Sequence, residues 1–360
     1  MRQTPSESNT VVTTSAGRAA WPQLTPSRRT KGENPLARKI ILDVDTGSDD
    51  AVAIMMAALA PAIDLVACTT VWGNLGLDST TDNTLRVLEY VGCGEVPVHR
   101  GLSRPFAPTA FPPNPGEDRN RTKLHAERVP LPAARRSALA TPAVEWLVEY
   151  LRTAAQPVTL VSVAPLTNIA AAITVDPRIV GAVEEVVLMG GGHAIGNSTA
   201  SAEANIWHDP VSADVVFQAG FERLTVVPLD ATHEAYLTLD DVATLRAAGP
   251  PASAAAGFIE HMISGYAEMQ PMEPRDSSPL HDALCIAYLL DAAVLELQSC
   301  YAAIETTGRH TYGRTVFDLR HRSLREHNVH VAMHADRERF VRILHDALID
   351  GAGSNSLQCL

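Results

Sequence analysis

The sequence has little positive charge and few aromatic side chains. Its 29 basic and 41 acidic residues leave a net charge of −12. Nucleic acids and anionic membranes are bound through positive surfaces, so neither is expected as the main partner. Aromatic residues make up 5% of the chain, too few for the stacking platforms that hold single strands. We therefore expect an acidic globular protein with neither a nucleic-acid nor a membrane partner.

Long hydrophobic runs and paired cysteines are also missing. The longest apolar stretch, residues 51–63, is interrupted by Pro61 and is too short to span a bilayer. The five cysteines are widely spaced and contain no Cys-x-x-Cys pair, which argues against a disulfide framework and a zinc site. Reduced thiols in a cytosolic protein are the simpler interpretation.

Composition divides the chain into three parts. Residues 1–38 hold ten Ser or Thr within the first thirty positions and only two acidic residues, Glu7 and Glu33. This leader has no apolar core of a secretory signal, so we expect a disordered extension, with a transit peptide or an upstream start codon as the alternatives. Residues 39–350 are predicted to form the catalytic domain, and residues 351–360 a tail.

Within that domain, short apolar strands alternate with helices. Strands are predicted at residues 40–42, 65–71, 158–163 and 183–189, and helices at 49–59, 79–91 and 167–173. Such alternation predicts an α/β fold, an open and mostly parallel sheet flanked by helices, with the ligand at the carboxyl ends of the strands. After residue 230 the chain is expected to be mostly helical to 290. Short strands at 301–305, 314–319 and 329–333 and a helix at 336–348 should follow.

The pattern lapses between residues 101 and 138. Seven prolines lie in this Pro-rich insertion. A structureless loop of this length is typical of a functional lid or a disordered insertion, and we favour a lid over the site.

Four carboxylates directly follow the first strand: Asp43, Asp45, Asp49 and Asp50, within eight residues. A helix start needs one or two acids, and four repel one another unless a cation neutralises them. Oxygen ligands without His or Cys favour a hard ion, Ca²⁺ or Mg²⁺. The alternative is a capped helix start with solvated acids.

The same segment would suit a haloacid dehalogenase-like phosphatase, with Asp43 as nucleophile and Asp45 as acid. That chemistry also needs a downstream basic residue and a late acidic motif. The three lysines all lie in the first half of the chain, and no Gly-Asp-x-x-x-Asp follows a late strand. This interpretation is therefore disfavoured.

Residues 43–50 also resemble the Asp-x-Asp-x-Gly-x-Asp-Asp signature of the inosine–uridine-preferring nucleoside hydrolase family. Further motifs of that family follow in order: Thr-Val-x-Gly-Asn at 70–74, Pro-Leu-Thr-Asn-Ile-Ala at 165–170, Met-Gly-Gly-Gly at 189–192 with Asn197, Glu203, Asn205 and Asp209, Leu-Asp-Ala-Thr-His at 229–233, and His-Asp at 281–282. The resemblance spans about residues 39–350. It implies a nucleoside hydrolase-like, Rossmann-like fold and hydrolysis of the N-glycosidic bond of ribonucleosides to base and ribose.

The resemblance assigns roles by position. A Ca²⁺ ion would be held by Asp45, Asp50, Asp282 and the main-chain carbonyl of Val163, and Asp45 would also be the general base for the attacking water. Asp43 would orient its neighbours. The substrate contacts would be Asp49, Asn74 and Asn205 at the 2′- and 3′-hydroxyls, and Met189, Asn197 and Glu203 at the 5′ side.

At the base end, His281 would donate the proton to the leaving base, with His125 and Tyr266 as further contacts. His281 favours a base-nonspecific or pyrimidine-preferring enzyme, since purine-specific members carry Trp there. His193 and His208 match no family position and are interpreted as structural or surface residues. The resemblance further implies a cytoplasmic homodimer or homotetramer in nucleoside salvage. A catalytically weak nucleoside- or ribose-binding relative is the alternative function.

Overall fold

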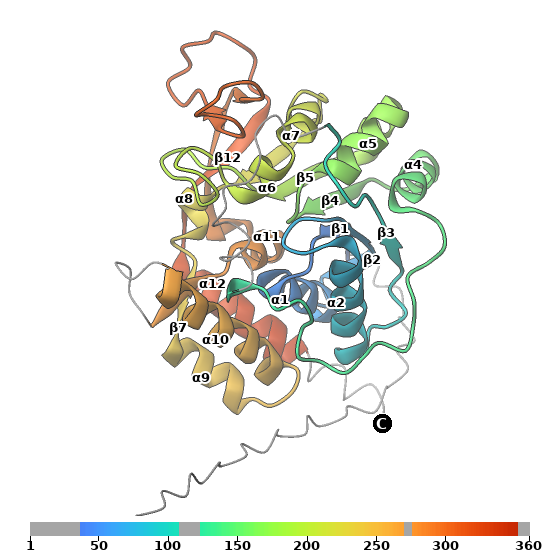
Figure 1. The fold of residues 1–360 in the computed structure, drawn as a ribbon, viewed down its shortest axis with the longest axis vertical. Coiled ribbons are helices and arrows are strands. Elements are labelled where there is room, and N and C mark those ends of the chain that lie inside the picture. Colours follow the sequence, from blue (N-terminus) through green and yellow to red (C-terminus); the bar gives the residue numbers. More distant parts are fainter. Residues whose placement is uncertain (1–36, 108–122, 270–275, 352–360) are drawn as a thin grey trace, which may run out of the picture.

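The computed structural model describes residues 37–107, 123–269 and 276–351 (Figure 1). The first strand, β1, begins at Arg38, one residue before the predicted domain boundary. The remainder of the predicted leader, the centre of the Pro-rich insertion and the tail after Gly351 lie outside the described residues.

An eight-stranded sheet forms the centre of the molecule, in the order β3-β2-β1-β4-β5-β6-β12-β9. Its strands are β1 (Arg38–Val44), β2 (Ile63–Thr70), β3 (Val98–Arg100), β4 (Val158–Ser162), β5 (Val183–Met189), β6 (Leu224–Val227), β9 (Leu295–Cys300) and β12 (Val329–Ala335). All neighbouring pairs are parallel except β12 and β9, which pair antiparallel at the edge. The predicted open, mostly parallel sheet is confirmed.

Helices cover both faces of this sheet (Figure 1). One hydrophobic core packs α1 (Ser48–Leu59), α2 (Leu77–Tyr90), α9 (Leu239–Ala247), α10 (Ala252–Met269), α11 (His281–Leu290) and α12 (Arg337–His345) on one side. A second core packs α4 (Ala143–Thr153), α5 (Thr167–Val175) and α7 (Pro210–Phe217) on the other. The short helices α6 (Ala204–His208) and α8 (Leu229–Thr232) follow β5 and β6. Apolar side chains are therefore buried on both faces, as a parallel sheet requires.

Several elements differ from the sequence prediction. Strands β3, β6 and β9 are additional, and the segment predicted as mostly helical between 230 and 290 also contains β7 (Tyr236–Thr238) and β8 (Ser277–Pro279), which pair with each other. The predicted strands at 301–305 and 314–319 are β10 (Ala302–Ile304) and β11 (Thr315–Phe317), a hairpin separate from the main sheet. These segments are only three to six residues long, too short for periodicity to identify.

The carboxyl ends of the parallel strands lie along one edge of the sheet. Residues 43–50 follow β1, Asn74 follows β2, Val163 follows β4 and Met189 ends β5. The fold thereby brings the widely spaced sequence motifs together. None of the described helices combines the length and the apolar character needed to cross a membrane.

Candidate active site

A cavity opens at this carboxyl edge, and its wall comes from many elements. Eleven of the predicted site residues line it: Asp49, Asn74, His125, Val163, Met189, Asn197, Glu203, Asn205, Tyr266, His281 and Asp282. Asp43, Asp45 and Asp50 are buried beneath this lining rather than in it. The other lining residues are Leu124, Ser198, Ala204, His208 and Met262, and none of the sixteen is Lys or Arg.

Three buried carboxylates gather at the floor of the cavity. Asp49, Asp50 and Asp282 each offer an oxygen within 4.8 Å of the others, an arrangement that could hold a metal ion. Burial, together with the neighbouring carboxylates, raises the pKa of Asp50 to about 7 and that of Asp282 well above its ordinary value. Among the described residues, Asp49 Oδ1 is buried without a hydrogen-bond partner, 3.8 Å from His125 Nδ1. Ionisation of Asp50 and Asp282 is therefore unfavourable unless a cation balances their charge, and none of the sixteen lining residues is a Lys or Arg that could do so.

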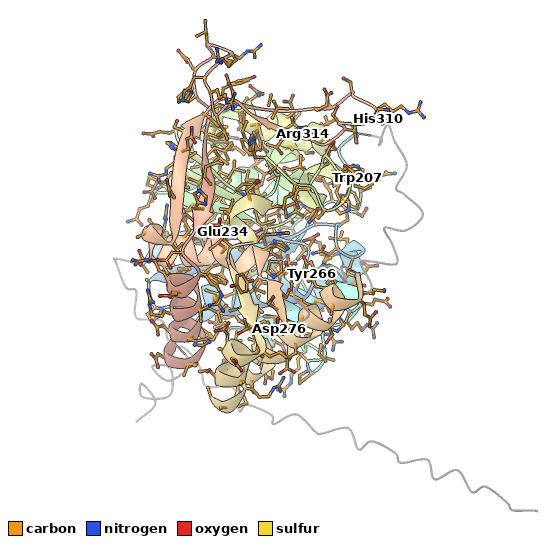
Figure 2. All side chains as sticks on the ribbon, turned by 90° about the vertical axis from the view of Figure 1, so that its left-hand side faces the viewer. Trp207, Glu234, Tyr266, Asp276, His310 and Arg314 are labelled. Atoms are coloured by element: carbon orange, nitrogen blue, oxygen red, sulfur yellow. The ribbon has the colours of Figure 1, made fainter. Side chains whose placement is uncertain are left out.

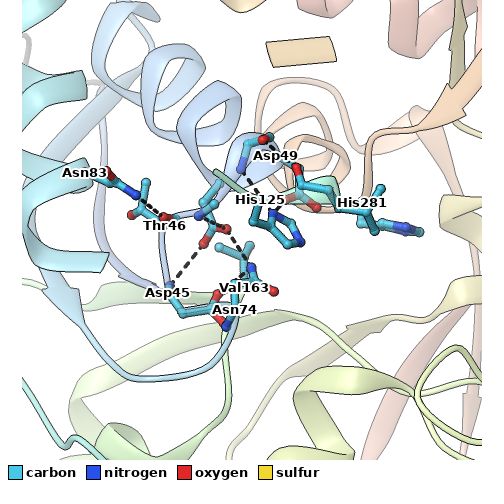
Figure 3. Close-up of polar contacts among 12 residues, drawn as sticks. Asp45, Thr46, Asp49, Asn74, Asn83, His125, Val163 and His281 are labelled. Carbon is cyan, nitrogen blue, oxygen red and sulfur yellow. Dashed lines mark hydrogen bonds and ion pairs between the residues drawn. The ribbon is translucent and has the colours of Figure 1, made fainter. Parts of the chain in front are cut away.

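Asp45 lies just below, bound to Asn74 (Figure 3). The main-chain N–H of Asn74 donates to Asp45 Oδ2 at 2.5 Å, and its Nδ2 donates to Asp45 Oδ1 and Asp50 Oδ2, both at 3.2 Å. Burial and the charge of Asp50 raise the pKa of Asp45 well above its ordinary value. Asp45 is thus a stronger base than a solvated carboxylate, but it is not among the three clustered metal-type ligands.

Glycine permits the close approach of chain segments around these acids. A Cβ on Gly73 would collide with the Asp45 carboxylate, and a Cβ on Gly47 would collide with the His125 ring. Ser48 then fixes the segment that carries His125, since its N–H donates to His125 Nδ1 at 3.2 Å and its Oγ donates to the Leu124 carbonyl at 2.8 Å. His125, at the C-terminal side of the Pro-rich insertion, is therefore held against the start of α1.

Asp43 does not face the cavity. Its Oδ1 accepts hydrogen bonds from Thr69 Oγ1 at 2.5 Å and from Asn168 Nδ2 at 2.8 Å. Asn168 Nδ2 also donates to the Thr70 carbonyl, and its Oδ1 accepts from the Leu102 N–H. The contacts of Asp43 thus join the ends of β1 and β2 to the start of α5, behind the acids of the floor.

The opposite wall consists of amides and one buried acid. Asn205 Nδ2 donates to the carbonyls of Val163 and Met189, at 3.2 and 3.1 Å. Glu203 caps α6 and accepts hydrogen bonds from the N–H groups of Gly191, Asn205 and Ile206. Burial raises the pKa of Glu203 to about 7 in spite of these bonds. Asn197 Oδ1 accepts from the Ala204 N–H, so the loop after β5 is tied to α6.

His281 occupies the other end of the cavity. Its Nδ1 lies 2.7 Å from Thr232 Oγ1, and its Nε2 lies 2.8 Å from the Tyr266 hydroxyl. Burial, with the nearby rings of His233 and His125, holds the pKa of His281 well below its ordinary value, so the imidazole is neutral at pH 7. Tyr266 and His281, which come from α10 and α11, thus form one hydrogen-bonded unit.

Some cavity residues were absent from the sequence analysis. His208, which had no place in the predicted site, is buried and lines the wall. Met262 precedes Tyr266 by one helical turn on α10, and this spacing could have suggested it. Thr232 belongs to the Leu-Asp-Ala-Thr-His motif at 229–233, yet only the folded structure reveals its contact with His281.

The residues present fit a hard divalent cation. The clustered donors are all carboxylate oxygens, the ligands that Ca²⁺ and Mg²⁺ prefer, and Asp49 Oδ1 is a buried acceptor whose needs the described residues do not meet. The carbonyl of Val163 also borders the cavity and has a second lone pair beside its bond to Asn205.

Comparison with known proteins places this site in a family. Residues 40–342 match the model of the inosine-uridine preferring nucleoside hydrolase. The chain is 36% identical to the pyrimidine-specific ribonucleoside hydrolase RihA of Shewanella woodyi over 314 residues, which cover 87% of this chain and 98% of the relative. It is 38% identical to the pyrimidine-specific ribonucleoside hydrolase RihB of Escherichia coli over 283 residues, 78% of this chain and 87% of the relative.

Comparison with solved structures leads to the same family. A purine-preferring ribonucleoside hydrolase from Gardnerella vaginalis superposes with a TM-score of 0.79 and 29% identity, over 88% of this chain and 99% of that one. These matches exclude the phosphatase interpretation of residues 43–50. The chain therefore belongs to the inosine-uridine preferring nucleoside hydrolase family and is an enzyme that cleaves the N-ribosyl bond of nucleosides.

Proposed function

We propose that this enzyme is a Ca²⁺-dependent ribonucleoside hydrolase that prefers pyrimidine nucleosides and releases the free base and ribose. The observation that carries the proposal is the buried group Asp49, Asp50 and Asp282 at the floor of a cavity that has no Lys or Arg among its described lining residues. Buried carboxylates without a cationic partner are costly, and a bound cation removes that cost.

The proposed ligands of the ion are Asp45, Asp50, Asp282 and the carbonyl of Val163. Asp50 and Asp282 belong to the observed cluster, and Asp45 adjoins it through the shared amide of Asn74. When bound, Ca²⁺ would lower the pKa of a water molecule and bind the two ribose hydroxyls. Asp49, the third member of the cluster, would then be available to one of those hydroxyls.

The protein's own groups would carry the remaining steps. Asp45 would take the proton of the attacking water, a role supported by its raised pKa. Asn74 and Asn205 would hold the 2′- and 3′-hydroxyls, and Asp43 would orient the neighbouring residues from behind. Met189, Asn197 and Glu203 would lie along the 5′ side. Attack at the anomeric carbon passes through an oxocarbenium-like transition state, which surrounding carboxylates stabilise.

At the base end, His281, Tyr266 and His125 would assist departure of the base. The imidazole of His281 is neutral, so the Tyr266 hydroxyl bound to its Nε2 would give its proton to the leaving base; His281 would then stabilise the phenolate by hydrogen bonding until solvent restores the proton. The preference for pyrimidines is supported by the names of the relatives, which are 36% and 38% identical to this chain.

We further propose a cytoplasmic enzyme of nucleoside salvage that assembles as a homodimer or homotetramer. The four cysteines in the described part of the chain are buried and form no disulfide with one another, as is usual in a reducing compartment. Light scattering after size-exclusion chromatography would measure the assembly directly.

The direct test is ribose release from uridine, cytidine, inosine and adenosine, with calcium and after exhaustive chelation. We expect release from all or some of the four, fastest from the pyrimidine nucleosides, that stops on chelation and returns with calcium but not with magnesium. Release that persists after chelation would contradict the metal dependence. Binding of nucleosides without release would instead favour the weakly catalytic binding relative.

A further inference from the structure

We infer that His208 is a specificity-determining residue that hydrogen-bonds to the 5′-hydroxyl of the ribose. This inference rests on the proposed function, because it takes a ribonucleoside as the ligand of the cavity. No motif of the family accounts for this histidine, and none of the proposed steps above uses it.

His208 is a polar side chain built into the cavity wall. It is only 5% exposed and borders the cavity together with Asn197, Ser198, Glu203 and Ala204. It ends α6, one helical turn after Ala204, so both residues present the same helix face to the cavity. An imidazole ring nitrogen can exchange a hydrogen bond with a hydroxyl group, which is both donor and acceptor.

Two tryptophans fix the orientation of this ring. The rings of Trp72 and Trp207 meet His208 edge-on, with centroids 5.4 and 5.7 Å away. Trp207 is itself packed with Ala202 and Tyr312 in a small apolar cluster. Figure 2 shows Trp207 and Tyr266 at different heights of the molecule. The His208 ring is thus held in place before any ligand binds.

The backbone on either side of His208 is equally constrained. Glu203 caps the start of α6, and Asp209, the next residue after His208, caps α7 through the N–H of Ser212. The second oxygen of Asp209 accepts from Thr167 Oγ1 and from the Phe106 N–H. A polar group held on rigid elements discriminates better than one on a mobile loop, because little ordering is needed on binding.

Ribose stereochemistry points the 5′ group toward His208. In a β-ribonucleoside the base and the 5′ carbon lie on one face of the ring, and the 2′- and 3′-hydroxyls lie on the other. With those hydroxyls on the carboxylate floor and the base against His281 and Tyr266, the wall that remains for the 5′ group contains His208, Asn197 and Ser198. Glu203 lies in the same wall, and its negative charge, with no Lys or Arg among the described lining residues, disfavours a 5′-phosphate.

The test compares kcat/KM for uridine and 5′-deoxyuridine in the calcium-loaded protein. We expect the wild type to prefer uridine by about 30-fold, the size of effect seen when a buried group loses its hydrogen-bond partner. His208→Phe keeps the ring shape but removes both nitrogens. In that variant the loss on uridine should exceed the loss on 5′-deoxyuridine about tenfold, which brings the preference down to about threefold.

Two controls separate this role from packing. His99→Phe replaces another buried histidine, stacked on Trp146 away from the cavity, and should leave the 30-fold preference intact. His330→Phe replaces a half-buried histidine of β12 outside the cavity lining and should also leave the preference in place. Equal losses of kcat/KM on both substrates in His208→Phe would leave the preference unchanged and would overturn the inference.

Failure of the proposed function would look different. If the wild type hydrolyses neither nucleoside, calorimetric binding of uridine and 5′-deoxyuridine to the wild type and to His208→Phe still decides the role of His208. A preference for uridine in binding that disappears in the variant supports it, and no such change contradicts it.

Discussion

The protein buries carboxylates in two regions, and the pKa values of these groups shift in opposite directions. At the carboxyl edge of the sheet, burial raises the pKa of Asp50 to about 7 and that of Asp45 and Asp282 well above their ordinary values. Near the other end of the strands, Glu185 of β5 is also buried, at 3% exposure. Burial alone would raise its pKa, but hydrogen bonds from Thr225 and Arg38 and the charge of Arg223 bring the pKa below its ordinary value.

The difference lies in where each acid finds its partner. Glu185 accepts bonds from Arg38, Arg223, Thr225 and Tyr288, all within the chain. The acids of the cavity floor receive bonds from backbone and amide N–H groups, and the described residues that line the cavity include no Lys or Arg. Folding therefore supplies Glu185 with cationic partners, whereas the described residues supply none to the acids of the floor. This contrast is what the proposed cation site of the floor would require.

The largest expected effect comes from the acid that would accept a proton. Asp45→Asn should retain nucleoside binding but lower kcat by roughly a thousandfold, because an amide cannot take the proton of water. Steady-state ribose release would measure the loss, and calorimetry would measure the binding. Asp64→Asn, at the partly exposed partner of Lys39, is the control and should behave as wild type. An unchanged kcat in Asp45→Asn would remove this residue from the mechanism.

A medium effect is expected at the structural acid. Glu185→Gln should lower the free energy of unfolding by about 2 kcal/mol, because Arg38 and Arg223 lose a shared carboxylate but keep part of their hydration. Turnover should stay as in wild type, since Glu185 lies far from the cavity lining. Urea unfolding gives the first quantity, and Glu184→Gln on the exposed side of the same strand is the matched control. A loss of turnover at unchanged stability in Glu185→Gln would contradict the assignment of Glu185 as a purely structural acid.

The smallest effect concerns pH, and the two regions should differ in sign. Without metal, the folded pKa of Asp50 lies above its unfolded value, so this group costs stability as pH rises from about 4 to 7. Calcium needs the ionised form, so calcium affinity should rise about tenfold between pH 6 and pH 8. The folded pKa of Glu185 lies below its unfolded value, so its contribution is present above the unfolded pKa and is lost as pH falls through the folded one.

Thermal unfolding with increasing calcium at pH 6, 7 and 8 would follow this dependence. Asp282→Asn serves as the control, because it removes one acid of the cluster and should abolish most of the calcium-dependent stabilisation. A calcium effect that is equal at all three pH values would contradict the assignment of these acids as ligands.

The sequence predicted the long buried strands and the position of the polar residues that directly follow them. Apolar segments near residues 40, 65, 158 and 183 are long enough to identify as strands, and polar residues that follow parallel strands must meet at one edge. Asp43 to Asp50 and Asn74, which follow β1 and β2, lie at that edge as expected, whereas Val163 was expected there only from the family resemblance. It missed β6, because four apolar residues carry no period, and β9, because a half-exposed edge strand resembles a loop.

Side-chain roles that depend on packing across elements were harder to predict. His208 is followed by a helix-capping Asp, and nothing in its neighbours in sequence shows that Trp72, more than a hundred residues earlier, lies against it. The same holds for Thr232 and His281, whose contact joins α8 to α11. Long-range contacts of this kind arise from the assembled sheet and not from any local pattern.

The two ends of the cavity are formed by different segments of the chain, so they can change separately during evolution. The carboxylate floor comes from the first turn of α1 and the start of α11, whereas the wall at the Tyr266 end draws on Leu124, His125 and two positions of α10. Substitutions that face the cavity from α10 can therefore reshape the wall proposed to meet the base without replacing the acids of the floor. One fold can in this way support enzymes of different substrate preference, such as the purine-preferring and pyrimidine-specific enzymes that this chain resembles.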